Sequence, residues 1–432
     1  MSDGKDLKVR EGRPHVLVLM MYWLPYEGPI PLIYATLFQD LMKKGYRISL
    51  VASRPHFRFG WTGKWDKYKG RWLTREAWNG IDLYRVWVYA PEFQSRRFSI
   101  FFRILNFISF SISSLLVGLR VSKQADVLFV PSSPPFLAAL NAWIIGKLRG
   151  IPFVYNIQDL YPENMEVLGV IKKGGLSKLL EKLEIWLYNK AWKITVISER
   201  MREIILGKGM PAGKVKTIPN FHDTRRIVPL PKENRFALEH GLQDRFIVSY
   251  IGAVSYTHGV EYILEAAEIL SDTDGIAFMI LGRGEHFPVI KDIARGKALK
   301  NVFFLPEQPY ERMNEIWAAS DASVVCMRKG VSDYQVPSKT FGIMSSGRPV
   351  LAMVDERSAI WDIVEQSRGG ICVPPERPDL LALAIRDLYA NEEKRKEMGG
   401  KARDFVVRHY SEDSVADEYD RTFRASLRSD GA

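Results

Sequence analysis

Cysteine is scarce in this sequence. The 432 residues include only Cys326 and Cys372, whose separation does not suit a shared metal site. Two cysteines are also too few for a disulfide framework, which excludes a small disulfide-stabilised secreted protein and favours a reducing, cytoplasmic setting. Residues 1–14 are charged and polar and lack the apolar core of a signal peptide, so no secretory leader is expected there.

Acidic residues are outnumbered by basic ones. The chain has 50 aspartates and glutamates against 61 lysines and arginines, which gives a net charge of +11 and a pI near 9.4. This excess indicates an anionic partner: a nucleic acid, a phosphorylated ligand or an anionic membrane. The 47% of hydrophobic residues excludes a disordered or low-complexity chain, and the length suits two or three globular domains.

Long apolar runs are rare as well, with one exception at Phe98–Leu119. This run carries a single charge, Arg103, and is long enough to cross a bilayer. Five serines and Asn106 interrupt it, and arginines flank it at both ends. We therefore expect a buried or membrane-surface helix here rather than a transmembrane one.

Apolar runs of strand length alternate with helical patterns along most of the chain. Near-continuous runs of this kind are typical of parallel strands that are buried on both faces. The pattern predicts an α/β protein with two tandem Rossmann-like domains, joined by an exposed linker at 220–245 that is rich in proline and charge. The predicted strands are 15–23, 47–52, 81–89, 127–131, 152–157 and 193–197 in the first half, and 246–252, 276–282, 302–305, 322–326 and 350–353 in the second.

Glycine turns follow two strands of the second series. Gly252 ends one strand, and Arg283 lies between two glycines at the end of the next. Backbone amides at a helix start can bind a diphosphate, and a guanidinium group can clamp one. An ordinary turn with a solvated arginine would have the same sequence, so both interpretations stay open.

Pro337, Ser338 and Lys339 begin a predicted helix. Serine suits a helix start, whereas the helix dipole disfavours a lysine in the first turn. An anion bound at the helix start would account for Lys339, so ligand contact is favoured over surface decoration.

The order of these motifs resembles the retaining glycosyltransferases of group 1, also called family 4. The resemblance implies two Rossmann-like domains that face a cleft (GT-B), with an acceptor domain at 1–220, a donor domain at 221–409 and a terminal helix at 410–432 that packs back on the first domain. It spans residues 15 to 425 and rests on Pro25, Glu27 and Gly28, on Ile218-Pro219-Asn220, on Gly252 with Gly259, on Ala318–Asp321, on Pro337-Ser338-Lys339 and on Gly347-Arg348-Pro349.

Within this family, the chain is most similar to a subgroup that builds bacterial surface polysaccharides on a lipid carrier. The Ser-Pro-Pro and Asp-x-x-Pro-Glu stretches of that subgroup match residues 133–135 and 159–163. The resemblance implies a polyprenyl-linked acceptor, with Asp159 and Glu163 as candidate catalytic residues and Gly28 and Ser133 near the acceptor. Alternatively, Asp159 would cap a helix and Glu163 would lie on the surface.

The sequence departs from the wider family at several positions. The two family glutamates fall on Tyr334 and Gly342. The donor-loop arginine and lysine fall on Ala253 and His258, and the histidine of the first domain falls on Gln158. Diphosphate binding would then depend on Lys339, Arg283 and backbone amides. Because the sequence has no DxD-type metal pair in a plausible place, we expect binding without a metal or other cofactor. The predicted donor-binding residues are Asn220, Gly252, His258, Arg283, Glu307, Pro337, Ser338 and Lys339.

A basic and aromatic segment runs from Arg54 to Arg75. Cations for anionic lipid beside aromatics at headgroup depth suit a membrane surface, although single-stranded nucleic acid and a folded surface insertion are alternatives. The predicted membrane contacts are Lys64, Trp65, Lys67, Lys69, Arg71, Trp72 and Arg103.

Together these patterns predict a glycosyltransferase. It would move a sugar from a UDP- or GDP-sugar, with retention, to a polyprenyl-linked acceptor, and it would not bind nucleic acid. It would be peripheral on the cytoplasmic face of the plasma membrane. A nucleotide-sugar 2-epimerase of the same fold and a non-catalytic membrane-associated scaffold are the alternatives.

Overall fold

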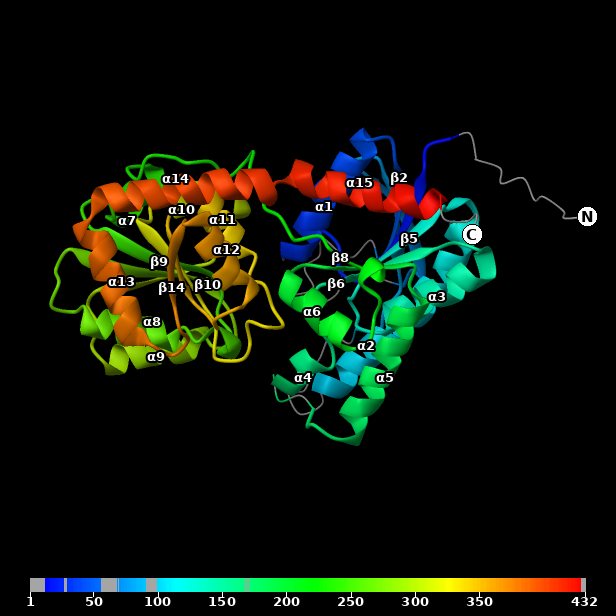
Figure 1. The fold of residues 1–432 in the computed structure, drawn as a ribbon, viewed down its shortest axis with the longest axis horizontal. Helices are drawn as coiled ribbons and strands as arrows, with labels where there is room; N and C mark the ends of the chain where they lie inside the picture. The colour runs from blue at the N-terminus through cyan, green and yellow to red at the C-terminus, as the bar shows by residue number, and fades with distance from the viewer. Residues whose placement is uncertain are drawn as a thin grey trace, which may run out of the picture.

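The computed structural model describes residues 12–26, 29–55, 68, 70–90, 99–167, 169 and 171–428. Two α/β domains lie side by side, and two long helices at the end of the chain run across both of them (Figure 1). The two largely parallel sheets confirm the predicted fold class.

The N-terminal domain has an eight-stranded sheet in the order β3-β4-β2-β1-β5-β6-β7-β8. Neighbouring strands are parallel except in the β3–β4 hairpin. β1, β5 and β6 are fully buried, which explains their near-continuous apolar sequences. The strands are β1 (His15–Leu19), β2 (Arg47–Ser53), β3 (Leu73–Trp78), β4 (Ile81–Val86), β5 (Val127–Pro131), β6 (Phe153–Ile157), β7 (Lys193–Val196) and β8 (Val215–Thr217).

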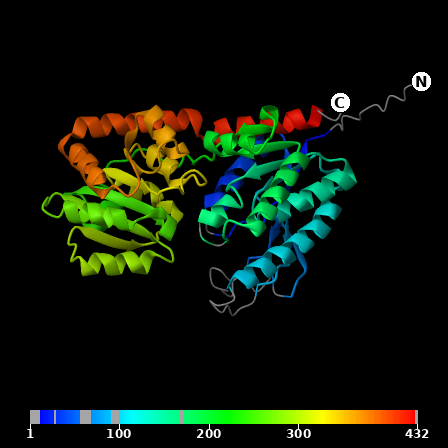
Figure 2. The ribbon, with the colours of Figure 1, turned by 60° about the horizontal axis from the view of Figure 1, so that its bottom comes forward.

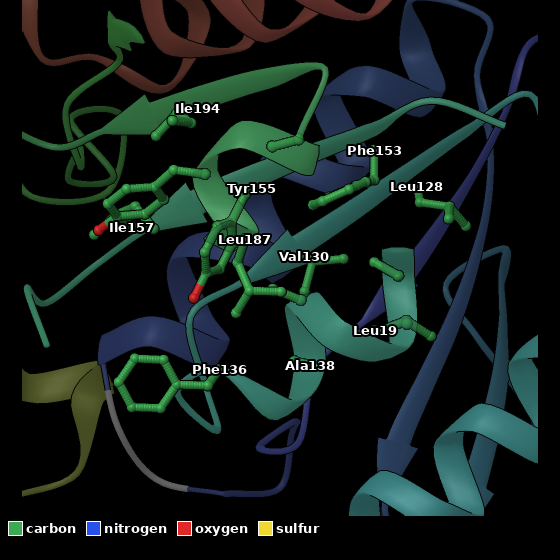
Figure 3. Close-up of a cluster of buried hydrophobic side chains, with 14 of the residues drawn as sticks. Leu19, Leu128, Val130, Phe136, Ala138, Phe153, Tyr155, Ile157, Leu187 and Ile194 are labelled. Atoms are coloured by element: carbon green, nitrogen blue, oxygen red, sulfur yellow. The ribbon is translucent and has the colours of Figure 1, made fainter. Parts of the chain in front are cut away.

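Helices cover both faces of this sheet. One face packs against α1 (Pro29–Lys43) and α15 (Glu412–Arg428). The other packs against α2 (Ser99–Val121), α3 (Leu137–Arg149), α5 (Gly175–Lys190) and α6 (Glu199–Gly207), and the short α4 (Glu163–Val167) follows β6. Figure 3 shows part of this second layer, where Leu187 of α5 packs near Phe153 and Tyr155 of β6.

The C-terminal domain has a six-stranded parallel sheet in the order β11-β10-β9-β12-β13-β14. Its strands are β9 (Phe246–Ala253), β10 (Ile276–Arg283), β11 (Val302–Pro306), β12 (Ala322–Cys326), β13 (Val350–Met353) and β14 (Gly370–Val373). Its helices are α7 (Arg235–His240), α8 (Glu261–Ile269), α9 (Phe287–Gly296), α10 (Met313–Ala318), α11 (Lys339–Ser345), α12 (Ala359–Ser367), α13 (Pro378–Ala390) and α14 (Glu392–His409).

The exposed linker predicted at 220–245 is too long. Phe221 is still part of the N-terminal core, whereas Ile227 and Phe236 are buried in the core of the C-terminal domain. The chain therefore crosses between the domains within the few residues after Phe221, and α7 already belongs to the second domain.

Short edge strands also escaped the sequence analysis. β3, β8 and β14 were not predicted. Each of them is an edge strand, with one neighbouring strand only. β3 begins at Leu73, so the end of the segment predicted as a membrane-surface loop, Leu73–Arg75, is part of the sheet. The sequence pattern also predicts a helix over residues 33–44, and α1 begins earlier, at Pro29.

The C-terminal helices connect the domains a second time. α14 packs on the second domain, whereas Tyr419 and Phe423 of α15 are buried against Phe129 of β5, with ring centroids 5.4 and 5.6 Å apart. The second crossing lies beside the first, because His222 and Ser411 form a β-bridge and the buried Glu412 accepts hydrogen bonds from Thr224.

Candidate active site

Lys339 is the first residue of α11 and lies beside the end of β9. Its Nζ atom is 3.7 Å from the centre of the Tyr250 ring, and a Cβ atom added at Gly252 would lie 3.6 Å from it. The Nζ atom is buried and has no hydrogen-bond partner in the described part of the chain. Burial lowers the pKa of Lys339 to about 7. Because a buried ammonium ion without a counter-charge is costly, this position is suited to an anionic ligand.

His258 lies next to the same lysine. Its Nδ1 atom is 2.9 Å from the hydroxyl oxygen of Ser255. Burial, and then the charge of Lys339, lowers the pKa of His258 to about 3, so the imidazole is neutral. The cation that the family places in this loop is thus absent, and Lys339 brings a positive charge to the same place from α11.

Arg283 and Glu307 form an ion pair at the ends of β10 and β11. The Nε atom of Arg283 is 2.9 Å from an Oε atom of Glu307, and both side chains are about half exposed. The ends of β10 and β9 approach each other closely here. A Cβ atom at Gly282 would lie 1.9 Å from the carbonyl oxygen of Gly252. Only glycine fits at Gly282, so the glycine turn serves the packing of the two strand ends.

The missing family glutamates have a steric explanation. A Cβ atom at Gly342 would lie 2.4 Å from the Trp317 ring, so the indole occupies the space that a glutamate side chain would need. Tyr334, at the position of the other glutamate, packs against the core of the N-terminal domain. The C-terminal domain therefore cannot use these two positions as carboxylates.

Asp159 follows β6 in the N-terminal domain. It makes no hydrogen bond or ion pair with another described residue, and burial raises the pKa of its carboxyl group to about 6. It does not cap α4, which begins at Glu163. A carboxyl group of this pKa can take up or release a proton near neutral pH, as general acid–base chemistry requires.

Glu163 has a different environment. One of its carboxylate oxygens lies 2.6 Å from Nζ of Lys208, and Glu184 lies 2.6 Å from the same nitrogen. The Lys208 and Glu184 side chains are almost fully buried, and burial raises the pKa of Glu184 to about 7. Glu163 is therefore one member of a charged cluster inside the domain, although its second oxygen has no partner among the described residues.

Asn220 is held by the N-terminal domain. Its side-chain amide donates to Gln158 at 2.8 Å, and Gln158 donates to Asn156 and Tyr34 at 2.7 and 2.9 Å. The carbonyl oxygen of Ser133, after β5, accepts a hydrogen bond from the Met21 backbone at 3.3 Å.

Both domains line a cavity of about 240 Å³. Ser338 and Tyr310 contribute from the C-terminal domain, Thr36 from α1, and Arg226 from the crossing segment. Elsewhere the β12–α11 loop, which includes Pro337, touches the N-terminal domain, because Asp333 pairs with Arg200 at 3.2 Å. In the described part of the chain no three His, Cys, Asp or Glu side chains are grouped to hold a metal ion.

α2 exposes an apolar stripe along one side. The segment 101–124 is long and apolar enough to cross a membrane by length and composition, and 28% of its most apolar window is buried. The stripe consists of Phe101, Ile104, Ile108, Ile112 and Leu116, which are 43–56% exposed. On α5, Leu176, Leu179 and Leu183 are exposed beside Lys172, Lys173, Lys178 and Lys182.

The remaining predicted membrane contacts have mixed outcomes. Of these contacts, Lys64, Trp65, Lys67 and Lys69 lie outside the described residues, as does Gly28, which was predicted near the acceptor. Arg71 and Trp72 are exposed, and Trp72 stacks on Trp87 with centroids 5.8 Å apart. Arg103 is exposed as well, but on a different side of α2 from the stripe.

Two family models match this chain. One, described as Glycosyltransferase Family 4, matches residues 35–226, and the other, described as Glycosyl transferases group 1, matches residues 232–405. The chain belongs to the group 1 glycosyltransferases. The two matches divide the chain at the crossing segment, in agreement with the two domains.

Among curated relatives, the putative colanic acid biosynthesis glycosyl transferase WcaI of Escherichia coli is 24% identical over 80% of this chain and 85% of that protein. The probable glycosyltransferase WbjE of Pseudomonas aeruginosa is 25% identical over 67% of this chain and 72% of that protein. Among solved structures, HepE of Anabaena in complex with UDP has a TM-score of 0.72 at 14% identity and covers 95% of this chain and 100% of its own. This last similarity supports the GT-B fold of this group 1 glycosyltransferase.

Proposed function

We propose that this glycosyltransferase moves a sugar from a nucleotide diphosphate sugar, with retention, to a lipid-linked acceptor. The observation that carries the proposal is Lys339, a buried ammonium group without a counter-charge beside the glycine turn of β9. A diphosphate is the anion that such a turn and lysine suit. The solved complexes of HepE with UDP and UDP-glucose support a nucleotide sugar as the donor.

The proposed reaction needs no metal or other cofactor. As the bond between the sugar and the diphosphate breaks, negative charge develops on the leaving phosphate oxygens. Lys339, Arg283 and backbone amides would stabilise that charge, because they are already in place before the reaction. Asp159 would face the acceptor and accept or position its hydroxyl proton.

A membrane position is the second part of the proposal. The apolar stripe of α2 and the lysine-rich outer face of α5 combine hydrophobic and cationic groups, which suits a peripheral helix on an anionic lipid surface. The enzyme would then work at the cytoplasmic face of the plasma membrane. Acceptors differ among relatives, which include an alpha-galactosylglucosyldiacylglycerol synthase and a poly(ribitol-phosphate) alpha-N-acetylglucosaminyltransferase.

Donor binding tests the first part. In a thermal-shift and calorimetric screen of UDP- and GDP-sugars, we expect one nucleotide to bind, and Lys339→Ala to weaken its affinity and turnover by at least about tenfold, since a charged phosphate contact contributes about 1.5–3 kcal/mol. Lys396→Ala, a change of an exposed lysine on α14, is the matched control. Unchanged binding in Lys339→Ala would remove this residue from the site.

Transfer tests the rest of the proposed function. The purified chain would receive the nucleotide sugar that binds and a set of short-chain polyprenyl diphosphate sugars, and NMR of the product would give the anomeric configuration. We expect transfer with retention. If neither nucleotide binding nor transfer is seen, the chain is a scaffold without a working donor site.

A further inference from the structure

The cavity between the domains has walls from three segments that are far apart in the sequence. Thr36 and Gln39 come from α1, Arg226 from the crossing segment, and Tyr310 and Ser338 from the C-terminal domain. α1 lies at the edge of its own domain that faces the second domain (Figure 2). A second cavity of about 360 Å³ adjoins the first, because Thr36, Gln39 and Arg226 line both. This space therefore suits a ligand that touches both domains.

Polar side chains without partners converge on the first cavity. Among the described residues, the side chains of Thr36, Gln39, Tyr310 and Ser338 have no hydrogen-bond partner. The rest of the lining is mainly apolar and includes Leu24, Leu32, Ile33, Trp78 and Phe221. An apolar pocket with a few convergent polar groups is the usual form of a small-molecule site.

Arg226 and Tyr310 offer a flat surface in this cavity. The guanidinium carbon of Arg226 lies 4.7 Å from the centre of the Tyr310 ring. The ion pair of Arg226 with Glu311 is long, at 3.6 Å, and both of its side chains are exposed, so it leaves the guanidinium group open to a ligand. Nucleobases stack on aromatic rings and on guanidinium planes. The cavity therefore has a surface suited to a planar ring.

The loop before α11 indicates which part of a donor reaches this cavity. A nucleotide diphosphate sugar has the sugar on one side of its diphosphate and the nucleoside on the other. Gln335 of this loop donates a hydrogen bond to Asn164 of α4 at 2.9 Å, and Asn164 comes shortly after Asp159. Ser338, next to Lys339, lines the cavity instead. With the diphosphate at Lys339 and the sugar towards Asp159, the nucleoside is the part left for the cavity.

We propose that the cavity between the domains holds the nucleoside of the donor. The ribose would lie beside Ser338, and the base would stack on Arg226 with its polar edge towards Thr36 and Gln39. This inference rests on the proposed function, because it assigns the remaining part of the donor whose diphosphate binds Lys339. It makes α1 of the N-terminal domain part of the donor site, so that the nucleotide is held by both domains.

The experiment separates the nucleoside from the diphosphate. The probes are UDP or GDP, whichever binds the wild type, and inorganic pyrophosphate, which has the diphosphate without a nucleoside. Calorimetry gives the affinity of each variant for both probes. The ratio of the two affinities then measures what the nucleoside contributes to binding.

Two substitutions on α1 change the cavity without touching the diphosphate site. Thr36→Phe fills the cavity with a ring, so we expect the nucleotide affinity to fall by at least about tenfold. Gln39→Ala removes one polar group and should lower the nucleotide affinity by about three- to tenfold, the scale of one neutral hydrogen bond. Gln39→Ala only shortens a side chain, so it remains informative if Thr36→Phe does not fold.

The affinity for pyrophosphate should not change in either α1 variant. Lys339→Ala should instead weaken both probes, because it removes the cation that meets the phosphates. Gln366→Ala, which shortens an exposed glutamine on α12, is the matched control and should bind both probes as the wild type does.

Three results would overturn the assignment. Equal nucleotide affinity in the wild type and in both α1 variants would place the nucleoside elsewhere, and so would an equal loss of nucleotide and pyrophosphate affinity. A raised KM for the acceptor with unchanged nucleotide affinity would give the cavity to the acceptor. Failure of the proposed function is distinct, because the wild type would then bind neither probe, and the assignment would fall with it.

Discussion

Buried charges are paired in the interior of the N-terminal domain but unpaired at the two positions that we assign to substrates, one in each domain. In the interior of the N-terminal domain, Lys208 is neutralised by Glu163 and Glu184 at 2.6 Å each. At the sites, Lys339 in the C-terminal domain and Asp159 in the N-terminal domain have no opposite charge from a described residue. Because a buried charge without a partner is costly, these two groups indicate where a ligand supplies the missing partner.

The largest effect is expected from breaking the neutralised cluster. Lys208→Met would leave two carboxylates in the interior and should cost about 3–5 kcal/mol of the free energy of unfolding. The loss should be smaller at pH 5 than at pH 8, because burial raises the pKa of Glu184 to about 7, so this carboxyl group is protonated in the folded state at pH 5. Urea denaturation at both pH values measures this. A loss below about 1 kcal/mol at pH 8 would contradict the comparison.

The next effect concerns the unpaired carboxylate. Asp159→Asn should lower kcat by about a hundredfold, the usual scale of acid–base assistance. In the wild type, kcat/KM should fall below about pH 6, the pKa of Asp159, and this acid limb should be missing in the variant. Because burial raises the pKa of this carboxyl group, its ionisation destabilises the fold as the pH rises, so the variant should melt no lower than the wild type at pH 8. An unchanged pH profile would exclude Asp159 from the reaction.

A smaller effect is expected from the pH dependence of donor binding. In the free protein the pKa of Lys339 is about 7, with Tyr250, His258 and the Cys326 thiol facing it. A bound diphosphate raises this pKa, so binding takes up a proton and the affinity should fall by up to about tenfold per pH unit above pH 7. Lys339→Met should bind weakly and without this dependence. Calorimetry in buffers of different ionisation heat measures the proton directly, and an affinity that stays constant from pH 6.5 to 9 would contradict the prediction.

The smallest effect is expected from a paired charge on the surface. Arg200 pairs with Asp333 across the domains at 3.2 Å, but its side chain is 36% exposed. Arg200→Gln should therefore change the free energy of unfolding by less than about 1 kcal/mol and should leave donor affinity within about twofold. Differential scanning calorimetry and the nucleotide titration test both statements. A large loss would show that this pair stabilises the contact between the domains.

Long apolar strands made much of this fold predictable from the sequence. β1, β5, β9 and β10 are buried on both faces, so their composition alone separates them from helices. β3 alternates between exposed and half-exposed residues at the edge of its sheet, and β8 has only three residues, so neither has a buried pattern to detect.

The site was less predictable because it depends on contacts between distant segments. The sequence indicates that Lys339 begins a helix, but its position beside Gly252 and Tyr250 follows from the packing of α11 on β12 and β13, next to β9 in the sheet. Likewise, the loss of a glutamate at Gly342 is visible in the sequence, whereas its cause is the indole of Trp317. Lys208, the partner of Glu163, lies just after α6, and Glu184, which shares this lysine, comes from α5. Neither has a signal in the local pattern.

The return of α15 to the N-terminal domain has a consequence for synthesis. Tyr419 and Phe423 are part of the core that also contains β1, β2 and β5, and they leave the ribosome after the whole of the C-terminal domain. A domain usually folds as a unit while the rest of the chain is still being made. The N-terminal domain, which emerges first, therefore lacks one helix of its core until α15 has been made, so the C-terminal domain can be complete before it. A nascent chain stalled at residue 409 should therefore expose the apolar face of β5 to chaperones.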